Sequence, residues 1–220
     1  EQLEARYPVP VRVVYNGFGE RTADVATAPD PSGGLVIAHL GLLYRGRRDP
    51  TPLFRAVRAL EDDARRVRLE FYGPDVALVE RLARKEGVAS QVHAHLEVPY
   101  AESLAIQARA DALLLLMWEH PEEEGVLPGK LFEYMGAGRP VLAVGAGEGA
   151  AARLIADRGL GLASSDPAAI TAQLRVWLRE KDASGRVPPL PEGSTAEFAR
   201  AHQVRRLADF FSSVVAARDR

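Results

Sequence analysis

The chain has 220 residues, 47% of them hydrophobic, which is enough for one large domain or two small ones. Its formal charge of −2 gives no reason to expect nucleic acid or an anionic membrane surface as the main partner, although peripheral membrane association stays open. The absence of cysteine excludes disulfides and thiol chemistry and favours a cytoplasmic setting. No apolar run approaches the roughly 20 residues that span a bilayer, so we expect no transmembrane segment.

The N-terminal part of the chain predicts little regular structure. The chain begins on charged residues without a methionine or a signal peptide, so we expect an excised piece of a longer protein. Glu1–Arg6 is typical of a helix end and Val9–Tyr15 of a short strand. Asn16-Gly17 predicts a turn, and proline, glycine and polar residues predict a surface loop over Asp24–Gly34.

Short apolar runs then alternate with amphipathic stretches over most of the chain. This alternation predicts a parallel sheet with helices on both faces, an α/β fold of the Rossmann-like kind. The predicted strands are Leu35–Leu40, Val67–Tyr72, Gln91–Leu96, Asp111–Met117, Pro140–Val144 and Gly161–Ala163. The predicted helices are Leu53–Asp62, Asp75–Glu86, Tyr100–Ala110, one that Pro128 opens and Gly136 and Gly138 end, Glu148–Asp157 and Asp166–Glu180.

A proline-rich connector, Arg186–Gly193, separates this domain (residues 1–185) from a final segment (residues 186–220). Ser194 and Glu197 have the spacing of a capping box, which predicts a helix from Ser194 to about Ala217. Its apolar residues recur at helical spacing, and we expect the face they form to pack on the sheet domain. These residues are Leu207, Phe210, Phe211 and Val214.

Topology alone indicates where a ligand binds. If the strand order is 3-2-1-4-5-6, the order reverses between Leu35–Leu40 and Asp111–Met117, and the crevice opens at their carboxyl ends. The loops that follow them are 41–52 and 118–127, which have the most unusual polar content in the chain. A binding site is therefore expected between these two loops.

The first of these loops carries a cluster of arginines. Arg45, Arg47 and Arg48 follow Gly41, which lets the backbone bend. Guanidinium groups donate bidentate hydrogen bonds to phosphate, so three of them at this place suit a diphosphate. A solvated basic loop balanced by Asp49 is the alternative.

A second cation stands at the start of the helix that follows the second loop. Only three of the 28 basic residues are lysines, and Lys130 is one of them. A cation in the first turn of a helix opposes the helix dipole, and a bound phosphate would reverse that cost. Glu133 lies on the same helical face, so a plain surface ion pair is the alternative interpretation.

The stretch LPGKLFEYMGAGRPVLAV resembles the donor-binding motif of retaining glycosyltransferases of the GT-B fold. The resemblance implies that the chain is the C-terminal, donor-binding half of such an enzyme. An N-terminal acceptor-binding domain would then be missing, and the chain alone would be inactive or nearly so. The implied donor is a nucleoside diphosphate sugar, with no metal and no separate cofactor.

The resemblance also assigns roles to residues. Glu133 would accept hydrogen bonds from the ribose, Lys130 would bind the donor phosphate, and Glu124 or Glu123 would contact the donor sugar. Glu124 and Lys130 are the predicted catalytic residues. The predicted donor-binding residues are Gly41, Arg45, Arg47, Arg48, Leu127, Pro128, Gly129, Lys130 and Glu133.

Other polar residues received a structural interpretation. His93 and His95 alternate in a strand, but nothing nearby in the sequence completes a metal-ligand set. In the family, backbone groups at this strand read the base, and Leu96 replaces the usual glycine. His39 is expected to be a buried or rim residue. Gly145–Gly149 would place backbone amides beside the donor sugar.

Two other functions are alternatives for this sequence. A nucleotide-sugar epimerase of the same architecture would need histidines and carboxylates that converge on the sugar, and no such set is evident. A non-catalytic nucleotide- or sugar-binding module would fit Leu42, which stands where the family has its first arginine.

Overall fold

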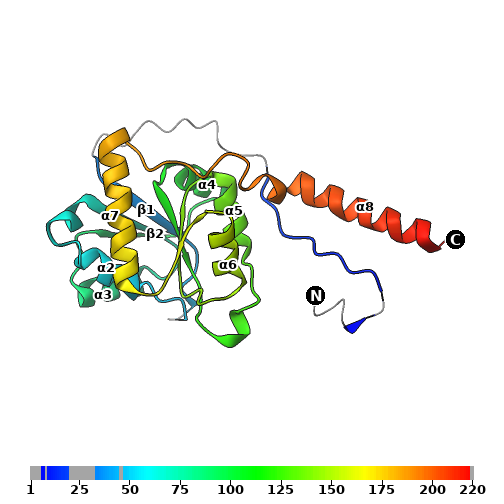
Figure 1. Cartoon of the computed structure of the whole chain (residues 1–220). Helices are drawn as coiled ribbons and strands as arrows, with labels where there is room; N and C mark the ends of the chain where they lie inside the picture. The colour runs from blue at the N-terminus through cyan, green and yellow to red at the C-terminus, as the bar shows by residue number, and fades with distance from the viewer. Residues whose placement is uncertain (1–5, 8, 20–32, 45–46, 219–220) are drawn as a thin grey trace.

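The computed structural model describes residues 6–7, 9–19, 33–44 and 47–218. Its sheet is six-stranded and parallel throughout, in the order β3-β2-β1-β4-β5-β6. The predicted Rossmann-like fold, drawn as a ribbon in Figure 1, and the predicted strand order are therefore confirmed, with the reversal between β1 and β4. The strands are β1 (Leu35–Leu40), β2 (Val67–Tyr72), β3 (Val92–His95), β4 (Ala112–Leu116), β5 (Val141–Val144) and β6 (Gly161–Ala163).

The helices connect the strands and end where the sequence provides stop signals. Gly138 and Gly185 adopt the left-handed conformation after their helices, which glycine tolerates best. Asp166 caps a helix by accepting hydrogen bonds from the backbone N–H groups of Ala168 and Ala169. The α-helices are α2 (Thr51–Arg58), α3 (Val76–Glu86), α4 (Tyr100–Arg109), α5 (Gly129–Ala137), α6 (Ala150–Asp157), α7 (Pro167–Ser184) and α8 (Arg200–Arg218). Short 3-10 helices are η2 (Glu61–Arg66), η3 (Pro121–Glu123) and η4 (Ala196–Phe198).

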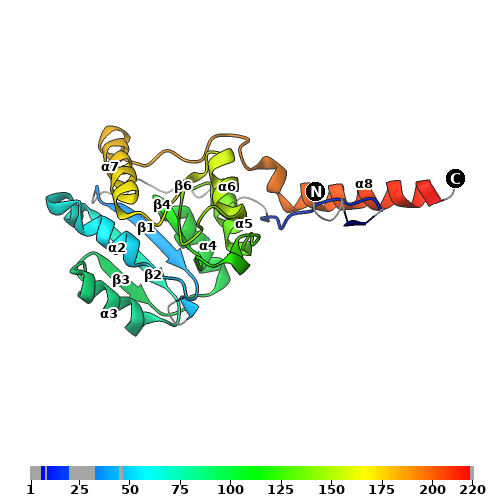
Figure 2. The same ribbon diagram turned by 60° about the horizontal axis from the view of Figure 1, so that its bottom comes forward.

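The sheet separates two apolar cores. Side chains from α2, α3 and α7, such as Phe54, Val79 and Trp177, pack on one face. The opposite face is covered by α4, α5 and α6, with Ile106 and Phe132 among the buried residues. Figure 2 shows the two helical layers on either side of the strands. Both faces are thus buried, which explains why the central strands read as uninterrupted apolar runs.

The segment before β1 differs from the prediction. Residues 9–15 form no strand, and the chain instead makes one parallel bridge between Phe18 and Ala199. The backbone N–H of Phe18 donates to the Phe198 carbonyl at 3.1 Å, and that of Arg200 to the Phe18 carbonyl at 2.8 Å. Most of the predicted helix end at 1–6 and of the predicted loop at 24–34 lies outside the described residues, as does Arg45.

The final helix starts later than predicted. α8 begins at Arg200, and Ser194 does not cap it: the Ser194 hydroxyl donates to the Pro191 carbonyl at 2.7 Å. The Glu197 carboxylate instead pairs with Arg158 and Arg206. A hydrogen bond of Ser194 within the turn and ion pairs of Glu197 with more distant arginines therefore replace the predicted capping box.

The apolar face of α8 does not pack on the sheet domain. Figure 1 shows the helix projecting away from the strands, and Leu207, Phe211 and Val214 are 38%, 59% and 38% exposed. Helical spacing defines a face but not the surface that covers it, so the predicted contact is wrong for the described residues.

Candidate functional site

The crevice at the carboxyl ends of β1 and β4 is held together by a buried tyrosine of α5. The Tyr134 hydroxyl lies 3.4 Å from the Leu40 backbone nitrogen, from which it accepts, and donates to the Leu114 carbonyl at 3.3 Å. Burial raises the pKa of this phenol, so it stays protonated as a donor. These hydrogen bonds fix α5 against both strands at the place where the strand order reverses, which is called the switch point below.

His39 is buried at the same place with one ring nitrogen unpaired. Its Nδ1 lies 2.9 Å from the Leu114 carbonyl and must carry the proton, because a carbonyl only accepts. Its Nε2 has no partner among the described residues. Burial, helped by the charges of Arg48 and Lys130, lowers the pKa of His39 to about 4. The imidazole is therefore neutral near pH 7. This agrees with the expectation from the sequence that His39 is a buried residue.

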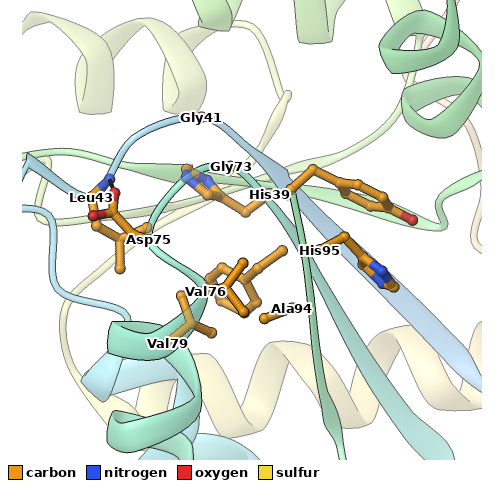
Figure 3. A pocket seen from close by; sticks show the side chains of 11 residues that line it. His39, Gly41, Leu43, Gly73, Asp75, Val76, Val79, Ala94 and His95 are labelled. Carbon is orange, nitrogen blue, oxygen red and sulfur yellow. Dashed lines mark hydrogen bonds between the residues drawn. The ribbon is translucent and has the colours of Figure 1, made fainter. Parts of the chain in front are cut away.

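A small cavity lies beside His39. It has a volume of about 10 Å³, close to what one water needs. Figure 3 shows His39, Gly41, Gly73 and Asp75 around it. The Asp75 carboxylate accepts from the Leu43 backbone N–H at 2.8 Å, which anchors the loop after β1. No Cβ fits on Gly73, because it would lie 2.4 Å from the Gly41 carbonyl oxygen.

The described arginines of this loop rest on aromatic rings. Arg47 lies over Trp118 with its guanidinium carbon 4.7 Å from the ring centre, and Arg48 lies over Tyr44 at 4.4 Å. Because Trp118 follows β4, Arg47 joins the two predicted loops across the switch point. Cation–π contacts of this kind hold a guanidinium in place while leaving its N–H donors available.

Lys130 and Glu133 stand where the helix prediction placed them. Pro128 is the N-cap of α5 and Gly129 its first residue, so Lys130 lies in the first turn. The ammonium nitrogen of Lys130 lies 2.9 Å from a Glu133 carboxylate oxygen, with the side chains 31% and 29% exposed. The structure therefore contains the ion pair, and the position also keeps the cation near β1, since its charge acts on His39.

The acidic loop after β4 lines one cavity. This cavity has a volume of about 280 Å³ between the ends of β4 and β5. The Glu124 backbone carbonyl accepts from the Ala150 N–H at 2.6 Å, which ties the loop to the start of α6. Gly145 is required here, because a Cβ would lie 2.2 Å from the Met117 carbonyl oxygen. The lining of the cavity includes Trp118, His120, the carboxylates Glu119, Glu123, Glu124 and Glu148, and residues Gly145–Gly147.

A second cavity, of about 470 Å³, lies along α5 on the side of α4. Gly129, Glu133 and Ala137 form one wall, and Tyr100 at the start of α4 contributes to another. The Asn16–Gly19 segment completes it. Sequence reasoning missed this cavity, since it treated Asn16-Gly17 as an ordinary turn and Tyr100 only as a helix start.

Of the two histidines of β3, His95 has structural partners. His95 Nε2 lies 2.6 Å from a Glu70 carboxylate oxygen, and its ring stacks on Tyr72 with centroids 4.6 Å apart. Among the described residues no group of three or more potential ligands could hold a metal ion. In the same part of the chain no helix is both long and apolar enough to cross a membrane.

Comparison with known proteins identifies the family. The chain is similar in structure to WaaG, a glycosyltransferase involved in lipopolysaccharide biosynthesis, with 25% identity and a TM-score of 0.53 over 68% of this chain and 39% of WaaG. The lipopolysaccharide outer core galactosyltransferase WaaB gives 21% identity and a TM-score of 0.65 over 96% of this chain and 59% of WaaB. HepE from Anabaena, solved with UDP and glucose, gives 15% and 0.63 over 92% of this chain and 56% of HepE.

The chain therefore spans between 39% and 59% of these neighbours. No curated protein sequence matches it significantly. The fold is that of GT-B glycosyltransferases. The profile of the group 1 glycosyl transferases matches residues 34–180, well over half of the sequence, and the chain belongs to the glycosyl transferases group 1 family.

Proposed function

We propose that this chain is the nucleotide-sugar-binding domain of a retaining glycosyltransferase. It would take part in transfer of a sugar from a nucleoside diphosphate sugar to an acceptor hydroxyl, with an N-terminal domain supplying the acceptor side. The observation that carries this proposal is the start of α5, where Lys130 pairs with Glu133 and where Gly129 and Glu133 line the cavity on the side of α4. The UDP and glucose bound by HepE, which shares the fold, support the donor class.

The diphosphate would lie against the cations at the switch point. Lys130 lies in the first turn of α5, where backbone N–H groups and the helix dipole favour an anion. Arg47 and Arg48 present guanidiniums from the loop after β1, each held over an aromatic ring. We expect the two to share phosphate binding, while Arg45 lies outside the described residues. Gly41, Leu127, Pro128 and Gly129 would shape the backbone around the phosphates.

The rest of the donor would extend to either side of the phosphates. Glu133 would accept both ribose hydroxyls, since a carboxylate has acceptor sites for two donors. The sugar would enter the cavity beside Glu124, where the loop is tied to α6. Negative charge develops on the leaving diphosphate during transfer, and prepositioned cations would stabilise it there. Lys130, Arg47 and Arg48 would supply the positive charge for this stabilisation, so the proposed mechanism requires no metal ion.

Separate alanine variants of Lys130 and Glu133 test the proposal. Lys130→Ala should spare nucleoside binding and weaken the nucleoside diphosphate at least tenfold, because a charge-assisted hydrogen bond contributes roughly 1.5–3 kcal/mol. Glu133→Ala should weaken nucleoside and diphosphate alike and should penalise a ribonucleotide more than its deoxy analogue. Calorimetry with uridine, guanosine and adenosine and their diphosphates measures both effects.

Two exposed residues of α3 provide matched controls. Lys85→Ala and Glu80→Ala remove the same groups from exposed positions of α3 that line none of the described cavities, and these variants should bind as the wild type does. If Lys130 and Glu133 form only a surface ion pair, their variants will also bind normally and lose at most a few tenths of a kcal/mol of stability. That result, or no binding of any nucleotide at millimolar concentration, would contradict a donor site.

A further inference from the structure

The cavity on the α4 side of α5 lies beyond the proposed phosphate site, and no part of the donor has yet been assigned to it. Its volume of about 470 Å³ lies within the range of roughly 300–1,000 Å³ typical of small-molecule pockets. Glu133 faces it and pairs with Lys130, so the cavity begins where the proposed ribose position ends. A group attached to the ribose on the side away from the phosphates would enter it.

The wall formed by Asn16–Gly19 is tightly built. A Cβ on Gly17 would lie 2.7 Å from the Arg200 Cα, and one on Gly136 would lie 2.8 Å from the Phe18 Cβ. Phe18 itself is 7% exposed and exchanges backbone hydrogen bonds with the η4–α8 connection. The segment therefore presents a preformed surface, although it lies outside the residues that match the family.

Tyr100 is the exposed aromatic residue of this cavity, whereas Phe18 is buried in its wall. It is 64% exposed at the first position of α4, and it lines the cavity together with Glu133 and the Asn16 turn. An exposed aromatic ring in the lining of a cavity offers a flat apolar face to a planar ligand. Stacking on such a ring suits any nucleobase, because every base has a π-face.

We propose that Tyr100 binds the base of the donor nucleotide by stacking, with Asn16–Gly19 as the wall of the base pocket. The inference rests on the proposed function and goes beyond the family motif, in which backbone groups of the strand at Val92–His95 read the base. In this chain a side chain of α4 and a segment before β1 take that part. In this arrangement Arg47 and Lys130 would bind the diphosphate, Glu133 the ribose and Tyr100 the base.

Tyr100→Leu and Tyr100→Phe test the stacking. Affinity for whichever of UDP, GDP and ADP binds should fall about tenfold in Tyr100→Leu, because base stacking contributes roughly 1–3 kcal/mol by truncation. Tyr100→Phe keeps the ring and should stay within about twofold of the wild type. Inorganic pyrophosphate lacks a base, and its affinity should be unchanged in both variants.

A control removes an exposed aromatic ring elsewhere. Phe211 is 59% exposed on α8, and Phe211→Leu should bind all ligands as the wild type does. Nucleotide binding that Tyr100→Leu leaves intact would overturn the base pocket while leaving the donor site standing. Equal losses for pyrophosphate and nucleotide would also overturn it, because they place Tyr100 at the phosphates. No nucleotide binding by the wild type would overturn the proposed function and this inference together.

Discussion

His39 shows how one buried residue couples the switch point to pH. Its side chain is neutral in the folded chain, because burial lowers its pKa from 6.5 to about 4. The unfolded chain takes up a proton below about pH 6.5, and the folded chain does so only near pH 4. Stability from this group is therefore complete above pH 6.5 and is lost as the pH falls from 6.5 to 4.

The expected loss over that window is about 3 kcal/mol, from about 1.4 kcal/mol per pH unit of difference between the two pKa values. Urea unfolding at pH 7 and pH 4 measures it. In His39→Asn the amide can still donate to the Leu114 carbonyl, but nothing titrates, so the variant should lack this part of the pH dependence. Identical pH profiles for both proteins would show that His39 is not buried as neutral imidazole.

At the scale of elements, a buried ion pair joins α7 to the amino ends of the central strands. The Lys181 ammonium lies 2.5 Å from the Asp111 carboxylate just before β4, and it also donates to the Gly34 carbonyl. The same carboxylate accepts from the Val36 N–H of β1 at 2.9 Å. Both partners are nearly fully buried, so neither charge can be solvated if the other is removed.

Lys181→Met should therefore lower the free energy of unfolding by about 3–5 kcal/mol. The double variant Lys181→Met with Asp111→Asn should recover part of the lost stability. The second substitution removes the unpaired charge and keeps an acceptor for the Val36 backbone N–H. Urea denaturation compares these variants with Arg84→Ala, whose exposed partner Glu80 lies 3.6 Å away on the same helix. The surface variant should change stability by no more than about 0.5 kcal/mol. Equal effects at both sites would refute a structural role for the buried pair.

At the scale of the whole molecule, charge differs between the two ends of the proposed donor site. Cations gather around the switch point, whereas carboxylates line the cavity between β4 and β5. Carboxylates accept hydrogen bonds from sugar hydroxyls but repel a carboxylate on the sugar. The proposed donor is therefore expected to carry a neutral sugar.

UDP-glucose should bind at least fivefold more tightly than UDP-glucuronate, provided that UDP itself binds. The pair GDP-mannose and GDP-mannuronate replaces it if the chain prefers GDP. The difference should shrink at high salt, since the lining carboxylates are partly exposed and screened. Equal affinities at low salt would mean that the sugar does not enter this cavity.

Most strands and helices of the sheet domain could be predicted from local patterns in the sequence. Apolar runs of strand length, glycine stops such as Gly87 and the Asp166 cap are local signals, so the alternation from Leu35 to the end of α7 could be predicted. The common order of such sheets, taken as a condition and confirmed by the structure, then located the crevice between β1 and β4. The common helical face of Lys130 and Glu133 could also be predicted, because residues three apart lie on one side of a helix.

Contacts between distant segments became visible in the three-dimensional structure alone. The Asn16 turn and Tyr100 share a cavity with Glu133, and Arg47 lies on Trp118, through contacts that no local pattern encodes. The sequence predicted the apolar face of α8, but it did not predict that this face is exposed. Periodicity follows from the backbone geometry of one element, whereas the surface that an element meets depends on packing of the whole chain.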